Sequence, residues 1–302
     1  MLILPTSFLI SLLSFALLYF SPNNSAMALL SEKTGGAKVT AEQAEDFAKS
    51  RGLDRGFSEM YGDWIGALLK GDLGTSYVDG KNINEKVGSA FFKTFVMSFI
   101  AVFAYSVFGV AIGVYVAVNN NEVTKKIADG WAVLSTAVPV FWIAMFFVWI
   151  FSVKLGVLKT VGVRSSLSLV PPGLLMGIIN TGNMIVTVKE KTSLILEEPF
   201  ILHARAMGLN MRTIMIHHIL KNITGPVIAL SMLAFSGFLG ASVLVERIFS
   251  IAGIGTLLSK AIGIKDYPIV AASVLITGVV ICTANMLSEA LYLLIDRREV
   301  GR

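Results

Sequence analysis

The chain has 302 residues, of which 55% are hydrophobic and only 15% are charged, and its mean hydropathy is +0.74. A soluble domain of this length carries more charge, so the composition excludes a soluble protein and predicts a membrane protein. The net charge of +5 does not indicate a nucleic-acid partner, because the basic residues form no clustered face with interleaved aromatic residues.

Six uncharged stretches each contain a segment long enough to cross a bilayer, which takes roughly 20 helical residues. They cover residues 1–31, 94–121, 131–153, 165–188, 222–245 and 267–288. The sequence therefore predicts an all-α membrane protein with six transmembrane helices. The first stretch lacks the basic n-region and the short apolar core of a signal peptide, so we interpret it as a retained helix.

The fourth stretch differs from the others because polar residues and prolines interrupt it. Pro171 and Pro172 lie near its start, and the segment Asn180-Thr-Gly-Asn183 lies near its end. Irregular backbone at membrane depth is tolerated only against protein or a water-filled cavity. We therefore expect this helix to line the interior.

A long polar segment follows the first stretch, so we divide the chain into a first transmembrane helix (1–22), an extracytoplasmic cap (23–88) and a five-helix core (89–302). In the cap, Thr40-Ala-Glu-Gln43 is a capping box that predicts a helix ending before Gly52. Trp64–Leu69 is amphipathic, and Gly71–Tyr77 predicts a tight glycine turn. This turn lacks the lysine context of a phosphate-binding loop.

The distribution of Lys and Arg among the short connections predicts the orientation. The loop 119–130, the segment 189–222 and the C-terminal tail hold ten basic residues, and the loops on the opposite side hold six. Cytoplasmic loops carry the excess of basic residues, which places both termini in the cytoplasm. With six transmembrane helices, the protein is predicted to be a multi-pass protein of the cell (inner or plasma) membrane.

Residues 200–222 form a basic segment that predicts a short helix-turn-helix. Ala204 and Ala206 permit close helix approach, Gly208 permits a turn with φ > 0, and Asn210 is suited to cap a second helix. The pattern alone fits two structures equally well: a hairpin held by a cytoplasmic partner and an amphipathic hairpin lying on the lipid surface.

This segment resembles the EAA loop of ABC importer permeases, in the form of the dipeptide, oligopeptide and nickel permease family, approximately Tyr-Val-x-x-Ala-Arg-Ala-x-Gly. Ala204, Arg205, Ala206 and Gly208 match that form. The acidic residue of the general motif is absent, as it commonly is in this subfamily.

The resemblance extends over nearly the whole chain. Further segments similar to the family are Gly52–Asp54, Gly71–Tyr77, Val138–Trp142, Val153–Gly156, Ile216–Asn222 with Pro226, Val245–Ser250, Gly253–Gly255, Asp266–Pro268 and Asp296–Arg298. Two departures stand out: Arg297 replaces a usual proline, and Ser250–Gly253 lacks a usual Trp-Pro.

The resemblance implies the translocation subunit of a binding-protein-dependent ABC importer with the type I permease fold. It further implies four kinds of neighbour: a homologous second permease subunit, two cytoplasmic ATP-binding subunits, an extracytoplasmic substrate-binding protein and membrane lipid. It also implies that the loop 189–222 couples the permease to the ATP-binding subunits. The coupling residues would be Ala204, Arg205, Ala206, Gly208, Leu209, Asn210 and Arg212.

The chain itself shows no sign of catalysis, cofactor binding or metal binding. Its only histidines are His203, His217 and His218, and adjacent helical residues point about 100° apart, so the last two are poorly placed to share a metal. No nucleophile has an adjacent base. Glu246 and Arg247 are candidates for a gate, with an ion pair that orients the helix end as the equally supported alternative.

The substrate is open between di- or oligopeptides, which we favour from the breadth of the family, and nickel or a metal chelate. A secondary transporter or a channel is the alternative from another class. Inverted repeats would favour a secondary transporter, and a ring of charges or carbonyls would favour a channel. Neither feature is visible in the sequence.

Overall fold

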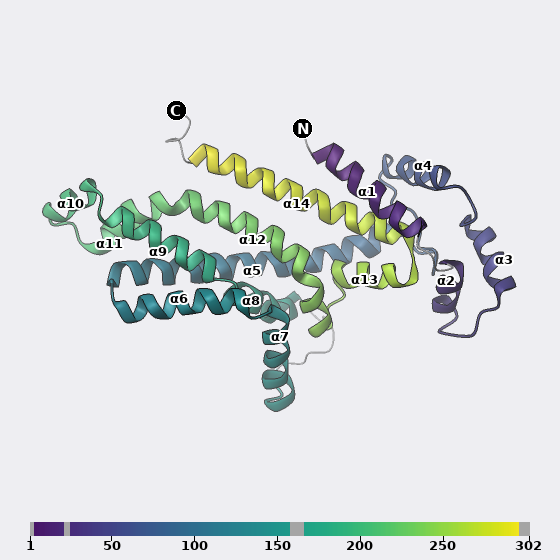
Figure 1. Cartoon of the computed structure of the whole chain (residues 1–302), viewed down its shortest axis with the longest axis horizontal. Coiled ribbons are helices and arrows are strands. Elements are labelled where there is room, and N and C mark those ends of the chain that lie inside the picture. The colour runs from purple at the N-terminus through teal and green to yellow at the C-terminus, as the bar shows by residue number, and fades with distance from the viewer. Residues whose placement is uncertain (1–2, 21–24, 158–165, 296–302) are drawn as a thin grey trace. The chain divides into compact units, whose positions relative to one another are not determined.

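The computed structural model describes residues 3–20, 25–157 and 166–295, and these residues are predominantly helical (Figure 1). Within those ranges the only extended pairing is an isolated bridge between Thr75 and Asn82. The predicted motif at 296–298 and the basic residues Lys159 and Arg164 lie outside them. The chain forms two compact units, residues 1–95 with 251–282 and residues 96–250 with 283–302.

The first unit contains four helices of the N-terminal region, the start of α5, α13 and most of α14. Their bounds are α1 (Ile3–Tyr19), α2 (Ser25–Lys33), α3 (Ala41–Arg51), α4 (Phe57–Leu68), α5 (Ile83–Asn119), α13 (Ile254–Ile264) and α14 (Tyr267–Ile295). The capping box of α3 is confirmed, since Gln43 N–H donates to Thr40 Oγ1 and Thr40 N–H donates to Gln43 Oε1.

An aromatic cluster forms the core of the first unit. The ring of Phe15 on α1 lies 5.5 Å from that of Tyr61 and 6.3 Å from that of Trp64, both on α4. It also lies 5.9 Å from the ring of Tyr267 at the start of α14. Trp64 is buried, which confirms the amphipathic character of α4.

A buried carboxylate ties the glycine turn to the start of α14. Ser76 Oγ donates to Asp266 Oδ2 at 2.6 Å, and Tyr77 N–H donates to Asp266 Oδ1 at 3.2 Å. Gly71 and Gly74 have φ values of 79° and 87°, which confirms the predicted turn. Burial raises the pKa of Asp266, although the hydrogen bonds from Ser76 and Tyr77 act in the opposite direction.

Removing the hydroxyl of Ser76 is expected to destabilise this link. Ser76→Ala leaves a fully buried carboxylate with one fewer donor, which costs about 1–3 kcal/mol. Proteolysis of the segment before α5 should become faster in the detergent-solubilised protein. Ser89→Ala is the control, since the exposed Ser89 hydroxyl donates only to the Lys86 carbonyl. Equal proteolysis rates for wild type and Ser76→Ala would contradict the role of the link.

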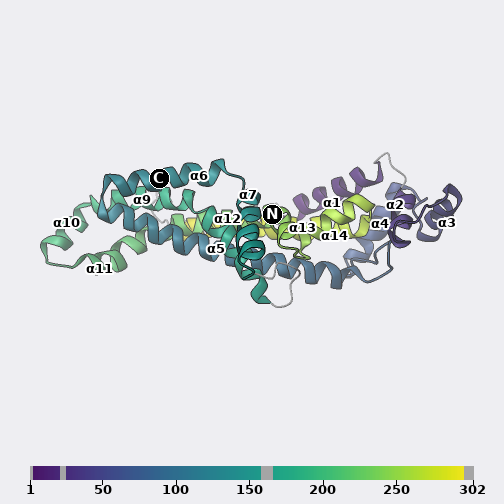
Figure 2. The same ribbon diagram turned by 90° about the horizontal axis from the view of Figure 1, so that it is seen from below.

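The second unit contains the rest of α5 and the helices from α6 to α12. Their bounds are α6 (Glu122–Ala137), α7 (Val140–Val148), the π-helix η1 (Trp149–Lys154), the 3₁₀ turn η2 (Ser166–Leu169), α8 (Val170–Ile179), α9 (Gly182–Leu196), α10 (Pro199–Ala206), α11 (Met211–Ile214), the π-helix η3 (Met215–Ile219) and α12 (Leu220–Ile248). Helix α9 packs against both α6 and α12 (Figures 1 and 2).

Among the described residues, up to five helical segments are long and apolar enough to be spans, against the six predicted, and two of the five are broken. Three helices are long and apolar enough to cross a membrane: Ile83–Asn119, Met211–Ile248 and Tyr267–Leu291. The pairs α6 with α7–η1 and α8 with α9 satisfy the same criteria together, with bends of 94° and 50°. The shorter apolar part of α1, Pro5–Leu17, corresponds to the first stretch.

Two details of the predicted helices were wrong. The stretch 131–153 is not one helix, because α6 ends before Val138-Pro139 and proline disfavours helical geometry in the preceding residue. Pro171 and Pro172 do not interrupt the fourth span, since they lie in the first turn of α8, where prolines fit. The first helix, predicted within residues 1–22, is α1 at Ile3–Tyr19, and α2 begins at Ser25 in the segment assigned to the cap.

Candidate functional site

The predicted helix-turn-helix is formed by α10 and α11. Helix α10 ends in a Schellman motif, in which Leu209 N–H donates to the Ala204 carbonyl at 3.1 Å and Gly208 N–H donates to the Arg205 carbonyl at 2.9 Å. Gly208 has φ = 81°, so it occupies the left-handed conformation that glycine adopts without strain. Asn210 Oδ1 accepts from Thr213 N–H at 2.8 Å and caps α11. The turn geometry is therefore as the sequence predicted.

One face of this hairpin (residues 197–222) is anchored and the other is exposed. Ile201 and Ala204 of α10, together with Ile214 and Ile219, are buried, and α9 contacts both α10 and η3. The remaining coupling candidates are all exposed: Arg205, Ala206, Gly208, Leu209, Asn210 and Arg212. Only one of the two small alanines, Ala204, lies at a close helix contact, since Ala206 faces outward.

The exposed face of the hairpin combines apolar and basic side chains. Leu202, Met207 and Leu209 have exposed fractions of 56%, 64% and 38%, and Arg205 and Arg212 lie beside them in the sequence. Exposed apolar side chains together with arginines are typical of a protein-binding surface.

The second limb of the hairpin is continuous with a membrane-length helix. Residues 211–248 form one helix, which includes the π-helix η3 at Met215–Ile219 and, within α12, Pro226. At 1.5 Å per residue, about 39 Å of helix separates Met211 from Gly237.

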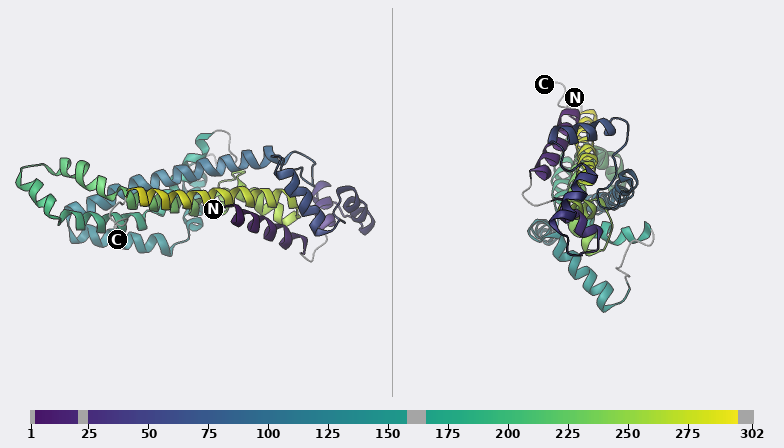
Figure 3. Two further views of the ribbon diagram at one scale, coloured as in Figure 1. Left: turned by 90° about the horizontal axis from the view of Figure 1, so that it is seen from above. Right: turned by 90° about the vertical axis from the view of Figure 1, so that its right-hand side faces the viewer.

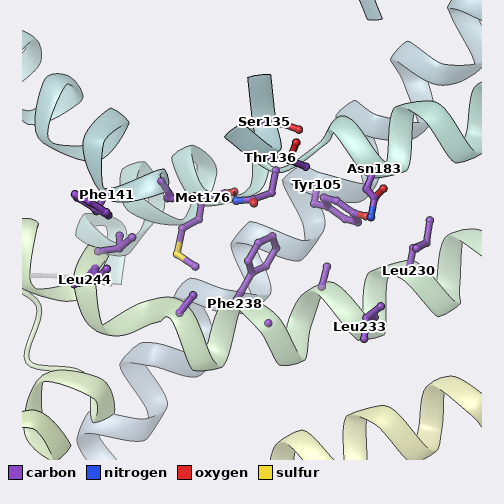
Figure 4. A pocket seen from close by; sticks show the side chains of 16 residues that line it. Tyr105, Ser135, Thr136, Phe141, Met176, Asn183, Leu230, Leu233, Phe238 and Leu244 are labelled. Atoms are coloured by element: carbon purple, nitrogen blue, oxygen red, sulfur yellow. Dashed lines mark hydrogen bonds between the residues drawn. The ribbon is translucent and has the colours of Figure 1, made fainter. Parts of the chain in front are cut away.

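A cavity of about 480 Å³ lies within the second unit, between α12 and the helices that face it (Figure 4). Its polar lining groups are Tyr105 on α5, Ser135 and Thr136 on α6, and Asn180 and Asn183 at the break between α8 and α9. Helix α12 supplies an apolar wall that includes the small residues Ala234, Gly237 and Ala241. No lining side chain is charged.

The break between α8 and α9 is held by α6. Trp131 Nε1 donates to Thr181 Oγ1 at 2.9 Å, and the Thr181 hydroxyl donates to the Ile178 carbonyl. At Gly182 an added Cβ would lie 2.1 Å from Ser135 Oγ, so only glycine permits this approach of α9 to α6. The expectation that this interrupted span lines an interior space is confirmed for Asn180 and Asn183.

The two gate candidates occupy different surroundings at the end of α12. Glu246 is fully buried, whereas Arg247 is exposed. Neither residue lines the cavity, although the neighbouring Val245 does. A role for this pair in gating stays a prediction.

Within the described ranges no group of three or more His, Cys, Asp or Glu side chains is placed to hold a metal ion. His203 is exposed, and the ring of His218 lies 5.9 Å from that of Phe200 on α10. The contact packs the two limbs of the hairpin against each other.

The sequence did not single out Tyr105 or α12 as cavity walls. The small residues Ala234, Gly237 and Ala241 recur every three or four positions, a spacing that places them on one helix face. Tyr105 lies in an otherwise apolar span, and the polar hydroxyl of a tyrosine there was the signal that could have predicted its position at the cavity.

The model of the family "Binding-protein-dependent transport system inner membrane component" matches residues 109–300. The glutathione transport system permease protein GsiC of Pectobacterium atrosepticum is 29% identical over 294 residues, which is 97% of this chain and 94% of that protein. The Shigella flexneri protein of the same name is 28% identical over the same shares.

A solved structure shares the fold. A chain of the inward-facing MetNI methionine ABC transporter superposes with a TM-score of 0.55 and 16% identity. The match covers 70% of this chain and 96% of that one.

Proposed function

We propose that this chain, which belongs to the family of binding-protein-dependent transport system inner membrane components, carries short peptides or peptide-like solutes across the membrane. As a member of this family it is a multi-pass permease subunit of an ABC importer and not itself an enzyme. The observation that carries the proposal is the uncharged cavity of the second unit. Relatives at 28–29% identity are glutathione permeases, and glutathione contains peptide bonds.

The lining of the cavity favours a peptide over a bare metal ion. Divalent nickel is bound by imidazole, thiolate or carboxylate groups, and the cavity lining contains none of these. Neutral amide and hydroxyl groups instead suit the neutral donors and acceptors of a peptide bond. The volume of about 480 Å³ lies within the usual range of ligand pockets.

We propose that the hairpin of residues 197–222 couples transport to ATP hydrolysis in partner subunits. Its exposed face supplies a docking surface, and its second limb continues into the helix that walls the cavity. Movement of the docked ATPases would displace this helix and change access to the cavity. The proposed assembly contains a homologous second permease subunit, two ATP-binding subunits and an external binding protein.

The transport assay that tests this function uses the complex expressed from the neighbouring genes and reconstituted in vesicles. With ATP on the hairpin side and binding protein on the other, we expect saturable uptake of labelled dipeptides or glutathione. Nickel uptake, alone or as a chelate, should stay at the level of vesicles that lack ATP. ATP-dependent nickel uptake without peptide uptake would refute the peptide assignment, and peptide uptake without ATPases would favour a secondary transporter or channel.

The proposed orientation places the cap outside and the hairpin in the cytoplasm. Lys38 and Val123 are exposed and neither caps a helix, so each can be replaced by cysteine with little effect on folding. In a Cys282→Ala background, Lys38→Cys should react with an impermeant thiol reagent in intact cells. Val123→Cys should react only after permeabilisation, and labelling of both from outside would refute the orientation.

A further inference from the structure

The polar groups of the cavity differ in whether they are already hydrogen-bonded. Ser135 Oγ donates to the Ala132 carbonyl at 2.8 Å, Thr136 Oγ1 donates to the Val133 carbonyl at 2.9 Å, and Asn180 Nδ2 donates to the Met176 carbonyl at 2.8 Å. The hydroxyl of Tyr105 and the carboxamide of Asn183 have no hydrogen-bond partner among the residues that the structure describes. These two groups therefore have donors and acceptors free for a ligand.

Both side chains are held in place by their surroundings. Tyr105 is 4% exposed, and its ring packs edge-on against Phe238 of α12, with centroids 6.1 Å apart and planes at 83°. Asn183 lies in the first turn of α9, directly after the break that Trp131 and Gly182 fix against α6. Figure 4 shows both side chains on the same side of the cavity, across from Leu230 and Leu233 of α12.

The two groups offer the chemistry that complements a peptide bond. The Asn183 carboxamide has both an acceptor and a donor, which match the N–H and C=O of one amide, and the Tyr105 hydroxyl adds a further donor or acceptor. Neither group carries a charge, so neither distinguishes acidic from basic side chains. The apolar wall of α12 with Ala234 and Gly237 leaves room for side chains of different shape.

We propose that Tyr105 and Asn183 bind the backbone amides of the peptide in transit and make the permease selective for the peptide bond over the side chains. This proposal rests on the peptide-carrying function proposed above. It predicts that substrates of different side-chain charge compete for one site, whereas substrates without backbone N–H groups bind weakly.

The test pairs a change in the protein with a change in the substrate. In reconstituted vesicles, Asn183→Leu should raise the KM for trialanine uptake by about 2- to 10-fold for each hydrogen bond that the carboxamide makes to the peptide. Trialanine with methylated peptide nitrogens should show a similar rise in wild type. Methylation should raise the KM of Asn183→Leu by a smaller factor than that of wild type, since the hydrogen bond from the peptide N–H to Asn183 is already lost in the variant.

Two further variants keep the test decisive. Tyr105→Phe removes one oxygen atom while keeping the ring packing against Phe238, and it should raise the KM in the same range. Thr224→Val is the matched control, since Thr224 lies in the same unit but does not line the cavity, its hydroxyl donates to the Leu220 carbonyl at 2.7 Å, and its KM should match wild type.

The outcomes separate this proposal from the function on which it rests. If wild type transports trialanine but Tyr105→Phe and Asn183→Leu have wild-type KM values, the backbone-binding proposal is overturned and the peptide function stands. Fully additive effects of methylation and Asn183→Leu also overturn it. If wild type transports no peptide, both proposals fall.

Discussion

Replacing Gly208 with valine is expected to abolish substrate uptake and substrate-stimulated ATP hydrolysis while the permease remains in the membrane at near-normal amounts. Gly208 has φ = 81°, and no atom lies within 4 Å of an added Cβ. The cost is thus backbone strain alone, about 1 kcal/mol or more for a β-branched residue. That strain disturbs the Schellman motif of α10 and shifts the surface that we propose docks on the ATPases. Vesicle uptake and ATPase assays measure the effect, and immunoblotting measures the amount of protein.

The chain offers a matched control at the end of α2. Gly35 has φ = 70° with no atom within 4 Å of an added Cβ, and the N–H groups of Gly35 and Gly36 donate to the Glu32 and Ser31 carbonyls in the same Schellman pattern. Gly35→Val therefore introduces a similar strain in the proposed cap and should leave coupling near wild type. Wild-type uptake by Gly208→Val, or equal losses in both variants, would remove the coupling assignment.

Replacing Gly177 with alanine is expected to destabilise the second unit and reduce uptake. An added Cβ would lie 2.2 Å from the Ala101 carbonyl oxygen and 2.8 Å from the Ala104 Cβ of α5. Because a helix backbone cannot yield locally, α8 must move away from α5, at a cost of about 1–3 kcal/mol or more. The shift also displaces Met176 and Asn180 at the cavity. A lower apparent Tm of the detergent-solubilised protein is the expected measurement.

Gly240→Ala is the control for this substitution. Gly240 lies in α12, and no atom lies within 4 Å of an added Cβ. Alanine there should leave the apparent Tm unchanged or raise it, because glycine in a helix interior is less favourable by about 0.5–1 kcal/mol. If both variants have the same Tm, the close packing of α8 on α5 does not limit stability.

The residues of the hairpin show how far local sequence patterns predict structure. Gly208 and Asn210 were placed correctly because a left-handed turn and a helix cap depend on the residue itself and its immediate neighbours. The capping box at Thr40 and the glycine turn at Gly71 succeeded for the same reason. The break before Pro139 was missed although its signal was present, because apolarity over 131–153 took precedence over the proline.

The sequence by itself determined the membrane class, the approximate spans, the turn chemistry and the family resemblance, since composition, apolar run length and local motifs are properties of the chain alone. Tertiary structure decided which residues meet. Ser76 and Asp266 are 190 positions apart, and Tyr105 reaches the same cavity as Asn183 only because α5 and α9 pack into one unit. The tolerance of Gly177 and Gly240 to a side chain likewise depends on the neighbouring helix. Such contacts arise from helix packing, in which any of several faces can bury similar apolar area, and sequence spacing does not select among them.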